Sequence, residues 1–152
     1  MPEFEIRAIP RQHTAATVLN VPMEEIGEAM SKAFPHLFHA ITAAGATPVG
    51  PPLARYFTFG EPTIEFECAI PVAAPFTADG EVRPSSVGGG DAVVCTHIGP
   101  YDTIGQTWEA MMAWIGEQGR TPGGAGWESY LTDPGDEPDP AKWVTEVCMP
   151  LA

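Results

Sequence analysis

The chain has 152 residues, 44% of them hydrophobic, which is enough for the core of one ordinary domain. Seven Lys and Arg against 20 Asp and Glu give a formal net charge of -13; this excludes direct nucleic-acid binding, because a phosphate backbone must be met by clustered basic residues. No apolar run approaches the roughly 20 residues that cross a bilayer, and no secretory signal is visible, so we expect a cytoplasmic protein with no membrane contact.

The first half of the chain reads as strand, helix, strand, strand. These elements are predicted over residues 4–19, 23–44, 53–59 and 63–71. Pro35 lies inside the helical pattern and predicts a kink or a break there, while Gly45 is a natural C-terminal stop. Residues 73–90 are rich in Pro, Ser and Gly and are interpreted as a linker; whether they fold over a site as a lid stays open.

The second half repeats this plan. Its predicted elements cover residues 92–98, 101–118, 125–132 and 143–150, with a turn region at 133–140. A Gly-x-Thr-Pro run follows each helix, and the two runs begin 74 residues apart (119 − 45). We therefore predict an α+β fold of duplicated β-α-β-β units forming an antiparallel sheet, with two main helices and a central ligand groove. The whole chain, 1–152, would be one domain of two pseudo-repeats, about 1–72 and 91–152.

The cysteines and histidines suggest no metal site. Cys68, Cys95 and Cys148 form no CxxC pair, and their odd number fits three reduced, partly buried thiols. His97 is interpreted as a hydrogen-bonded structural residue, and the other histidines lack metal-ligand spacing with any cysteine. We expect neither a metal nor a cofactor.

Carboxylates and aromatic residues recur on the predicted strands. Alternation along the strands turns Glu67 and Glu146 away from the apolar faces and gives Glu128 and Tyr130 a common face. The expected ligand-binding set, with the repeat adding Tyr56, is Tyr56, Glu67, Glu128, Tyr130 and Glu146. Trp108 belongs to an apolar helical stripe, and packing in the core competes with a place in the groove wall.

A carboxylate beside aromatic faces attracts a delocalised or quaternary cation through its charge and through the ring quadrupoles. Tyr56, Trp108 and Tyr130 would line the walls of such a groove. Solvated strand faces are the competing interpretation for Glu67 and Glu146.

Three segments of the second half resemble the GyrI-like effector-binding family. They are HIGPYDTIGQTWEAMMAWIGEQG at 97–119, GWESYLTDP at 126–134 and WVTEVCMPL at 143–151, with looser matches at VPMEEIGEAM and IEFECAIPV in the first half. The resemblance implies a duplicated βαββ fold with a ligand groove, and its pocket glutamate and tyrosine fall on Glu128 and Tyr130. The family senses lipophilic cationic drugs when fused to a DNA-binding region; no such region is visible here, so we expect a stand-alone small-molecule binding protein.

Three functions fit these residues. The first is capture of lipophilic compounds, above all cationic or planar aromatic ones, in the acidic-aromatic groove. The second is a hydrolase of cyclopropane-bearing genotoxins, in which Glu128 acts as base and Tyr130 or Tyr56 donates a hydrogen bond. The third is a gyrase-inhibitor-like protein–protein inhibitor, so a protein partner stays an alternative to the small molecule.

Overall fold

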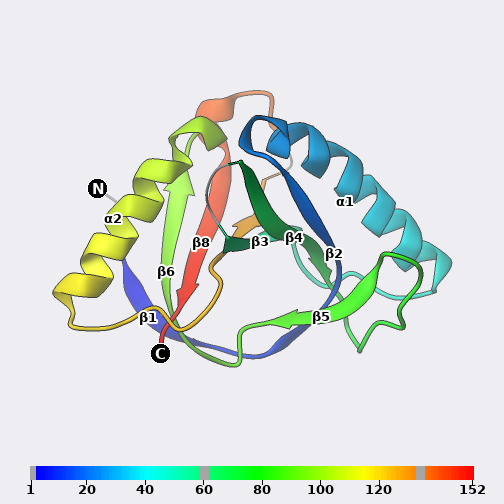
Figure 1. Ribbon diagram of the computed structural model, residues 1–152, viewed down its shortest axis with the longest axis horizontal. Helices are drawn as coiled ribbons and strands as arrows, with labels where there is room; N and C mark the ends of the chain where they lie inside the picture. Colours follow the sequence, from blue (N-terminus) through cyan, green and yellow to red (C-terminus); the bar gives the residue numbers. More distant parts are fainter. Residues whose placement is uncertain (1–2, 59–61, 133–135) are drawn as a thin grey trace. The chain divides into compact units, whose positions relative to one another are not determined.

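The computed structural model describes residues 3–58, 62–132 and 136–152 (Figure 1). The chain divides into two compact units. The terminal unit comprises Met1–Pro10 and Gly88–Ala152, and the middle unit comprises Arg11–Val87. Each unit packs a long helix against antiparallel strands, which confirms the predicted α+β fold. No helix among the described residues is long and apolar enough to cross a membrane.

The middle unit is an antiparallel sheet covered by one helix, α1 (Figure 1). Its elements are β2 (Gln12–Pro22), η1 (Met23–Glu25), α1 (Ile26–Ala43), β3 (Leu53–Thr58), β4 (Thr63–Pro71) and β5 (Arg83–Val87). The strand order is β3-β4-β2-β5. Leu37 and Ile41 of α1 are fully buried, as are Ile64, Phe66 and Ile70, which alternate along β4. The predicted apolar face of β4 is therefore the face that packs in the core.

The terminal unit has the same plan with a shorter helix. Its elements are β1 (Glu5–Ile9), β6 (Gly90–Ile98), η2 (Tyr101–Thr103), α2 (Ile104–Glu117), β7 (Trp127–Tyr130), η3 (Pro140–Lys142) and β8 (Val144–Pro150). The strand order is β1-β6-β8-β7. Its core joins α2 to β6 and β8 through Val93, Cys95, Met111, Ile115 and Val147.

The duplication is visible in matching backbone angles and strand bridges of the two units. Each helix ends at a glycine with positive φ, Gly45 at 70° and Gly119 at 68°, a conformation in which glycine carries no steric penalty. The Thr-Pro pair after each glycine then forms a bridge to the end of the last strand of the repeat, Pro48 to Val72 and Pro122 to Leu151. These matching contacts confirm the repeat that the spacing predicted.

The predicted strand over residues 4–19 is two strands instead of one. Pro10 interrupts the ladder, since it has no N–H to donate, and β1 pairs with β6 while β2 pairs with β4 and β5. A Cβ on Gly88 would lie 2.4 Å from the Pro10 carbonyl oxygen, so the glycine is needed for this close approach. β1 consequently belongs to the terminal unit, although the predicted first half contained it.

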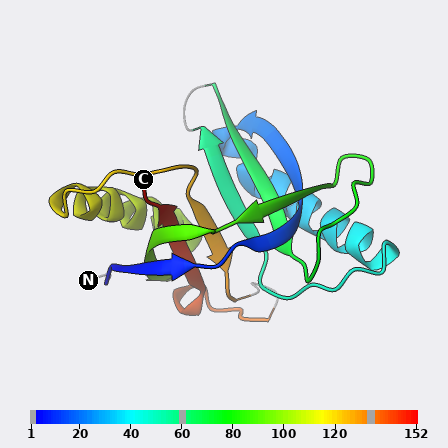
Figure 2. The same ribbon diagram turned by 90° about the horizontal axis from the view of Figure 1, so that it is seen from below.

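Two further expectations differ from the structure. Helix α1 runs unbroken through Pro35 (Figures 1 and 2), because buried residues on both sides of the proline, Ala33 and Leu37, hold the turns in the core. The segment 73–90, expected as a linker, contains strand β5. Of the expected turn region at 133–140, residues 133–135 lie outside the described residues; 140 opens the short helix η3.

Candidate functional site

Glu128 points from the sheet of the terminal unit toward α2. It is the second residue of β7 and lies opposite Val147 of β8, and Val147 packs with Met111 and Ile115 of the helix. Directly opposed residues share one face of a sheet, so the carboxylate lies on the helix side. Glu128 is only 5% exposed, so its charge is largely removed from water.

Two aromatic side chains donate hydrogen bonds to this carboxylate. Trp108 Nε1 donates to Oε1 at 2.7 Å, and the Tyr130 hydroxyl donates to Oε2 at 2.9 Å. Each oxygen thus receives a donor, and charge-assisted hydrogen bonds of this kind offset part of the cost of burying a charge. We call Trp108, Glu128 and Tyr130 the carboxylate cluster. The sequence predicted all three as ligand-binding residues, and the structure brings them together.

A glycine allows Trp108 to reach the carboxylate. A Cβ on Gly126 would lie 2.6 Å from Cη2 of the Trp108 ring, closer than any side chain tolerates. Trp108 therefore packs directly on the backbone that leads into β7, two residues before Glu128. The helical stripe that contains Trp108 is core at Met111 and Ile115, while Trp108 itself is half-buried and carries a polar contact.

Further rings extend the carboxylate cluster toward the start of α2. Tyr101 lies edge-on to Tyr130, with ring centroids 5.5 Å apart, and its centroid is 4.8 Å from that of Trp143. Trp143 Nε1 donates to the Glu137 carbonyl oxygen at 2.8 Å. The sequence analysis did not assign Tyr101 or Trp143 to the site. The sequence feature that could have identified Tyr101 is its position directly after Gly99-Pro100, a turn that ends one strand and starts the helix.

His97 is held by hydrogen bonds on the same side of the sheet. Its Nε2 lies 3.1 Å from the Pro100 carbonyl oxygen, and its Nδ1 lies 2.8 Å from Thr107 Oγ1. A carbonyl oxygen only accepts, so we assign the proton to Nε2, and Nδ1 accepts from the Thr107 hydroxyl. The residue is 7% exposed and hydrogen-bonded at both ring nitrogens, as expected for a structural histidine.

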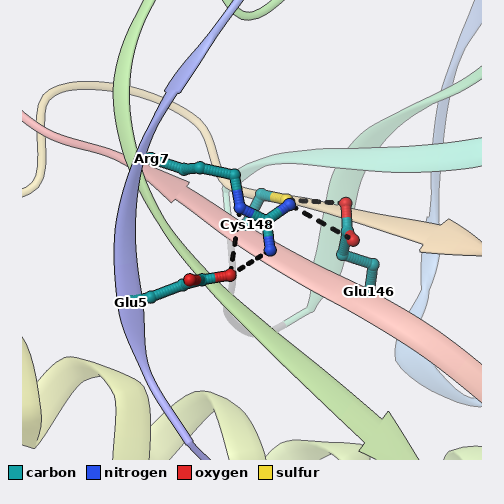
Figure 3. A network of polar contacts seen from close by, with 4 residues as sticks. All are labelled: Glu5, Arg7, Glu146 and Cys148. Atoms are coloured by element: carbon teal, nitrogen blue, oxygen red, sulfur yellow. Dashed lines mark hydrogen bonds and ion pairs between the residues drawn. The ribbon is translucent and has the colours of Figure 1, made fainter.

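Glu146 does not join Glu128. It lies opposite Ser129, the neighbour of Glu128 on β7, so the two carboxylates project from opposite faces of the sheet. Figure 3 shows Glu146 beside Arg7 and Cys148, with Arg7 Nη1 3.9 Å from Oε2 and Cys148 Sγ 3.8 Å from Oε1. Arg7 also forms an ion pair with Glu5 of β1 (Figure 3). This network ties the edge strand β1 to β8, which is a structural role.

Tyr56 and Glu67 lie in the middle unit and also project from opposite faces. Tyr56 pairs with Phe66 on the helix side, with ring centroids 6.1 Å apart. Glu67 lies opposite Arg55 and is 4% exposed, so the interpretation of a solvated strand face is wrong for Glu67. Arg55 Nη2 is 3.3 Å from Glu67 Oε1, and the Ser85 hydroxyl donates to the carboxylate at 3.1 Å.

The buried position of Glu67 raises the pKa of its carboxyl. Desolvation raises the pKa of its carboxyl, and the Arg55 charge and the Ser85 hydrogen bond lower the pKa by less than burial raises it. Ion pairing thus only partly compensates for the loss of water around this carboxylate.

The three thiols are free and buried, as expected. Burial raises the pKa of Cys68 to about 12, with the Glu67 charge as the second cause, and burial also raises the pKa values of Cys95 and Cys148. Such thiols are poor nucleophiles. Within the described part of the chain, no group of His, Cys, Asp and Glu could hold a metal ion.

A hollow of about 190 Å³ lies in the terminal unit, lined by residues 88–92, Trp127, Pro150 and Leu151. Trp127 precedes Glu128 on β7 and projects from the other face, so this hollow is not the carboxylate cluster. Its lining is mostly backbone and apolar side chains, with Asp91 as the charged residue. The cluster, with its buried charge, is the better candidate for recognition.

The fold is shared with several solved structures. The C-terminal domain of EcmrR has a TM-score of 0.90 at 20% identity, over 100% of this chain and 98% of that one. A hydrolase from Listeria innocua has a TM-score of 0.71 at 18% identity, over 99% and 92% of the two chains. SAV2435 bound to tetraphenylphosphonium has a TM-score of 0.69 at 12% identity, over 99% and 94%. At these identities the likeness concerns the fold alone.

A family model gives the broader relationship. The model described as GyrI-like small molecule binding domain matches residues 2–152, nearly the whole chain. No curated protein sequence matches the chain.

Proposed function

Because the chain belongs to the GyrI-like small molecule binding domain family, we propose that it binds a lipophilic organic cation and that Glu128 supplies the counter-charge. The ligand would lie against the rings of the carboxylate cluster, Trp108 and Tyr130, with Tyr101 next to them. The observation that carries this proposal is a carboxylate with 5% exposure that accepts hydrogen bonds from two aromatic side chains, Trp108 and Tyr130.

The physical reason lies in the cost of desolvation. A delocalised cation holds its water weakly, so it loses little on entering an aromatic site and gains the attraction of a carboxylate that water no longer screens. Trp108 and Tyr130 are half-buried, so their rings offer apolar area next to the charge. The tetraphenylphosphonium bound to SAV2435, a protein of the same fold, supports this class of ligand.

Glu128→Gln tests the counter-charge. A glutamine keeps the size of the side chain and can still hydrogen-bond Trp108 and Tyr130, but it removes the charge. We expect this variant to bind tetraphenylphosphonium more weakly than the unaltered protein by about 1–3 kcal/mol, measured by isothermal titration calorimetry. Triphenylphosphine oxide, a neutral compound of similar rings, should bind both proteins with equal affinity.

Glu146→Gln is the matched control. It removes the same charge from the same unit, but from the opposite face of the sheet. Its affinity for tetraphenylphosphonium should stay within about twofold of the unaltered protein, since the contacts that it changes, to Arg7 and Cys148, lie on the face of the sheet away from Glu128. Equal losses of affinity in the two variants would mean that only the net charge of the protein matters. An unchanged affinity in Glu128→Gln would show that Glu128 is not part of the site.

Hydrolysis is a second candidate, favoured by the 2.9 Å hydrogen bond from Tyr130 to Glu128 and by the Listeria innocua hydrolase of the same fold. In a cyclopropane conjugated to a carbonyl, a water oxygen would bond to a ring carbon while Glu128 takes the water proton. The ring C–C bond breaks, its electrons pass to the conjugated carbonyl, and Tyr130 delivers a proton to that oxygen. Mass spectrometry would detect the hydrated product, which should be absent with Glu128→Gln. A stoichiometric complex without product would contradict hydrolysis and support binding without turnover.

A further inference from the structure

One buried hydroxyl next to the carboxylate cluster makes no hydrogen bond within residues 3–58, 62–132 and 136–152. Thr145 of β8 is 0% exposed, and among the residues described by the structure its Oγ1 has no hydrogen-bond partner. It lies opposite Tyr130 on one side and His97 on the other, so it projects from the helix side of the sheet, as Glu128 does. An unsatisfied hydroxyl costs stability and calls for an explanation.

The fold itself does not require a hydroxyl at this position. In the middle unit, Phe66 of β4 occupies the corresponding place, between Leu19 of β2 and Tyr56 of β3. Phe66 is fully buried, so an apolar side chain fills this place well. The hydroxyl of Thr145 therefore adds something that the shared architecture does without.

No neighbour of Thr145 in the described part of the chain uses its hydroxyl as a hydrogen-bond partner. Both ring nitrogens of His97 are within hydrogen-bond distance of other groups, Thr107 Oγ1 and the Pro100 carbonyl oxygen. Opposed residues on paired strands have Cβ atoms about 5 Å apart, so a compound that lies against the half-buried Tyr130 ring comes close to Thr145.

We propose that Thr145 determines specificity within the site: its hydroxyl forms a hydrogen bond with a polar group of the bound cation. The inference rests on the proposed function and narrows the ligand class to lipophilic cations that carry a hydroxyl or an amine N–H on a ring near the charge. Such a group satisfies Thr145 Oγ1, whereas a purely hydrocarbon cation leaves it unsatisfied.

Three phosphonium ions of similar size test this preference. The unaltered protein should bind (3-hydroxyphenyl)triphenylphosphonium about 3- to 10-fold more tightly than (3-methylphenyl)triphenylphosphonium, the range of one added hydrogen bond. Thr145→Val replaces the hydroxyl with a methyl group of nearly equal volume. In this variant the preference should fall below about twofold, while the affinity for tetraphenylphosphonium stays the same.

Two control variants separate this role from packing. Thr145→Ser keeps the hydroxyl and should keep the preference. Thr14→Val removes another fully buried hydroxyl that has no partner among the described residues, in the middle unit, and it should leave the preference untouched. The melting temperature of Thr145→Val without ligand should equal or exceed that of the unaltered protein, because an unsatisfied polar group is removed.

The outcomes distinguish this inference from the proposed function. If the protein binds none of the three ions, the proposed function itself fails. If tetraphenylphosphonium binds and depends on Glu128, but the hydroxyl preference is absent or survives Thr145→Val, only the role of Thr145 is overturned.

Discussion

The two units share one architecture and differ in what lies between helix and sheet. Both have the strand order of an edge strand followed by the first, third and second strands of the repeat, and both helices end at a glycine with positive φ. In the terminal unit, Glu128 receives hydrogen bonds from Trp108 and Tyr130. In the middle unit the position of Glu128 holds Ala54, 74 residues earlier (128 − 54), and only Tyr56 repeats Tyr130.

The difference extends to other positions between helix and sheet. At several positions a residue of the terminal unit that makes or could make a hydrogen bond corresponds to an apolar residue of the middle unit. The pairs, with the residue of the terminal unit first, are Thr107/Ala33, Trp108/Phe34, Glu128/Ala54, His97/Leu19 and Thr145/Phe66. One architecture thus tolerates both fillings, and the apolar one needs no hydrogen-bonding partners. His97 and Thr107 satisfy each other, but Glu128, Trp108 and Thr145 are a feature that the shared fold does not require, and this is why we propose recognition in the terminal unit.

The largest effect is expected when the missing charge is introduced into the middle unit. Ala54 is 0% exposed, and Phe34 at the position of Trp108 has no indole N–H to donate. Ala54→Glu should lower the free energy of unfolding by about 3–5 kcal/mol, the cost of a buried charge without compensation. Urea unfolding of the full chain measures this loss.

Two further variants sharpen this comparison. Ala54→Gln adds a side chain of equal size without charge, so the difference between the two variants isolates the charge. Adding Phe34→Trp to Ala54→Glu supplies the indole donor and should recover part of the loss. Equal stabilities of Ala54→Glu and Ala54→Gln would contradict the claim that the helix side of the middle unit lacks the means to hold a carboxylate.

A smaller effect is expected from Gly126, the residue on which Trp108 packs. In Gly126→Ala the added Cβ would lie 2.6 Å from the indole, so the ring must move away from Glu128. We expect a loss of about 1–3 kcal/mol in the free energy of unfolding, typical of an overpacked core. Gly124→Ala is the control, because its Cβ would meet Pro150 at an ordinary 3.5 Å. A comparable loss in both variants would mean that the backbone, not Trp108, sets the cost.

Local sequence signals predicted much of the fold. Gly45 and Gly119 ended both helices, and the alternation in β4 identified its apolar face, because these features depend on a few neighbouring residues. The split at Pro10 was missed, since the proline can interrupt a strand or lie at its edge, and only the partner strands decide between the two.

The site was predictable in part. Alternation places residues on one of two faces within a strand, but the pairing of Ser129 with Glu146 decides that Glu128 and Glu146 face apart. Register depends on contacts between strands that single-strand patterns do not contain. The unsatisfied hydroxyl of Thr145 is likewise visible only when every neighbour is placed.

The smallest effect concerns the carboxylate that the middle unit does bury, Glu67 on the face away from α1. Burial raises the pKa of Glu67 above its ordinary value of 4.5, so the folded chain holds this proton at pH values where the unfolded chain has lost it. The free energy of unfolding should therefore fall as pH rises from 4.5 to the raised pKa. Glu67→Gln should lack this pH-dependent part of the free energy of unfolding. Urea unfolding at a series of pH values, with the two curves subtracted, isolates Glu67 from the other acidic residues.

Ser85→Ala removes a hydrogen bond that lowers the pKa of Glu67, so the pH-dependent loss of stability should extend to higher pH in this variant than in the unaltered protein. A difference curve that rises with pH would mean that Arg55 outweighs burial, and that the middle unit stabilises a charge as the terminal unit does.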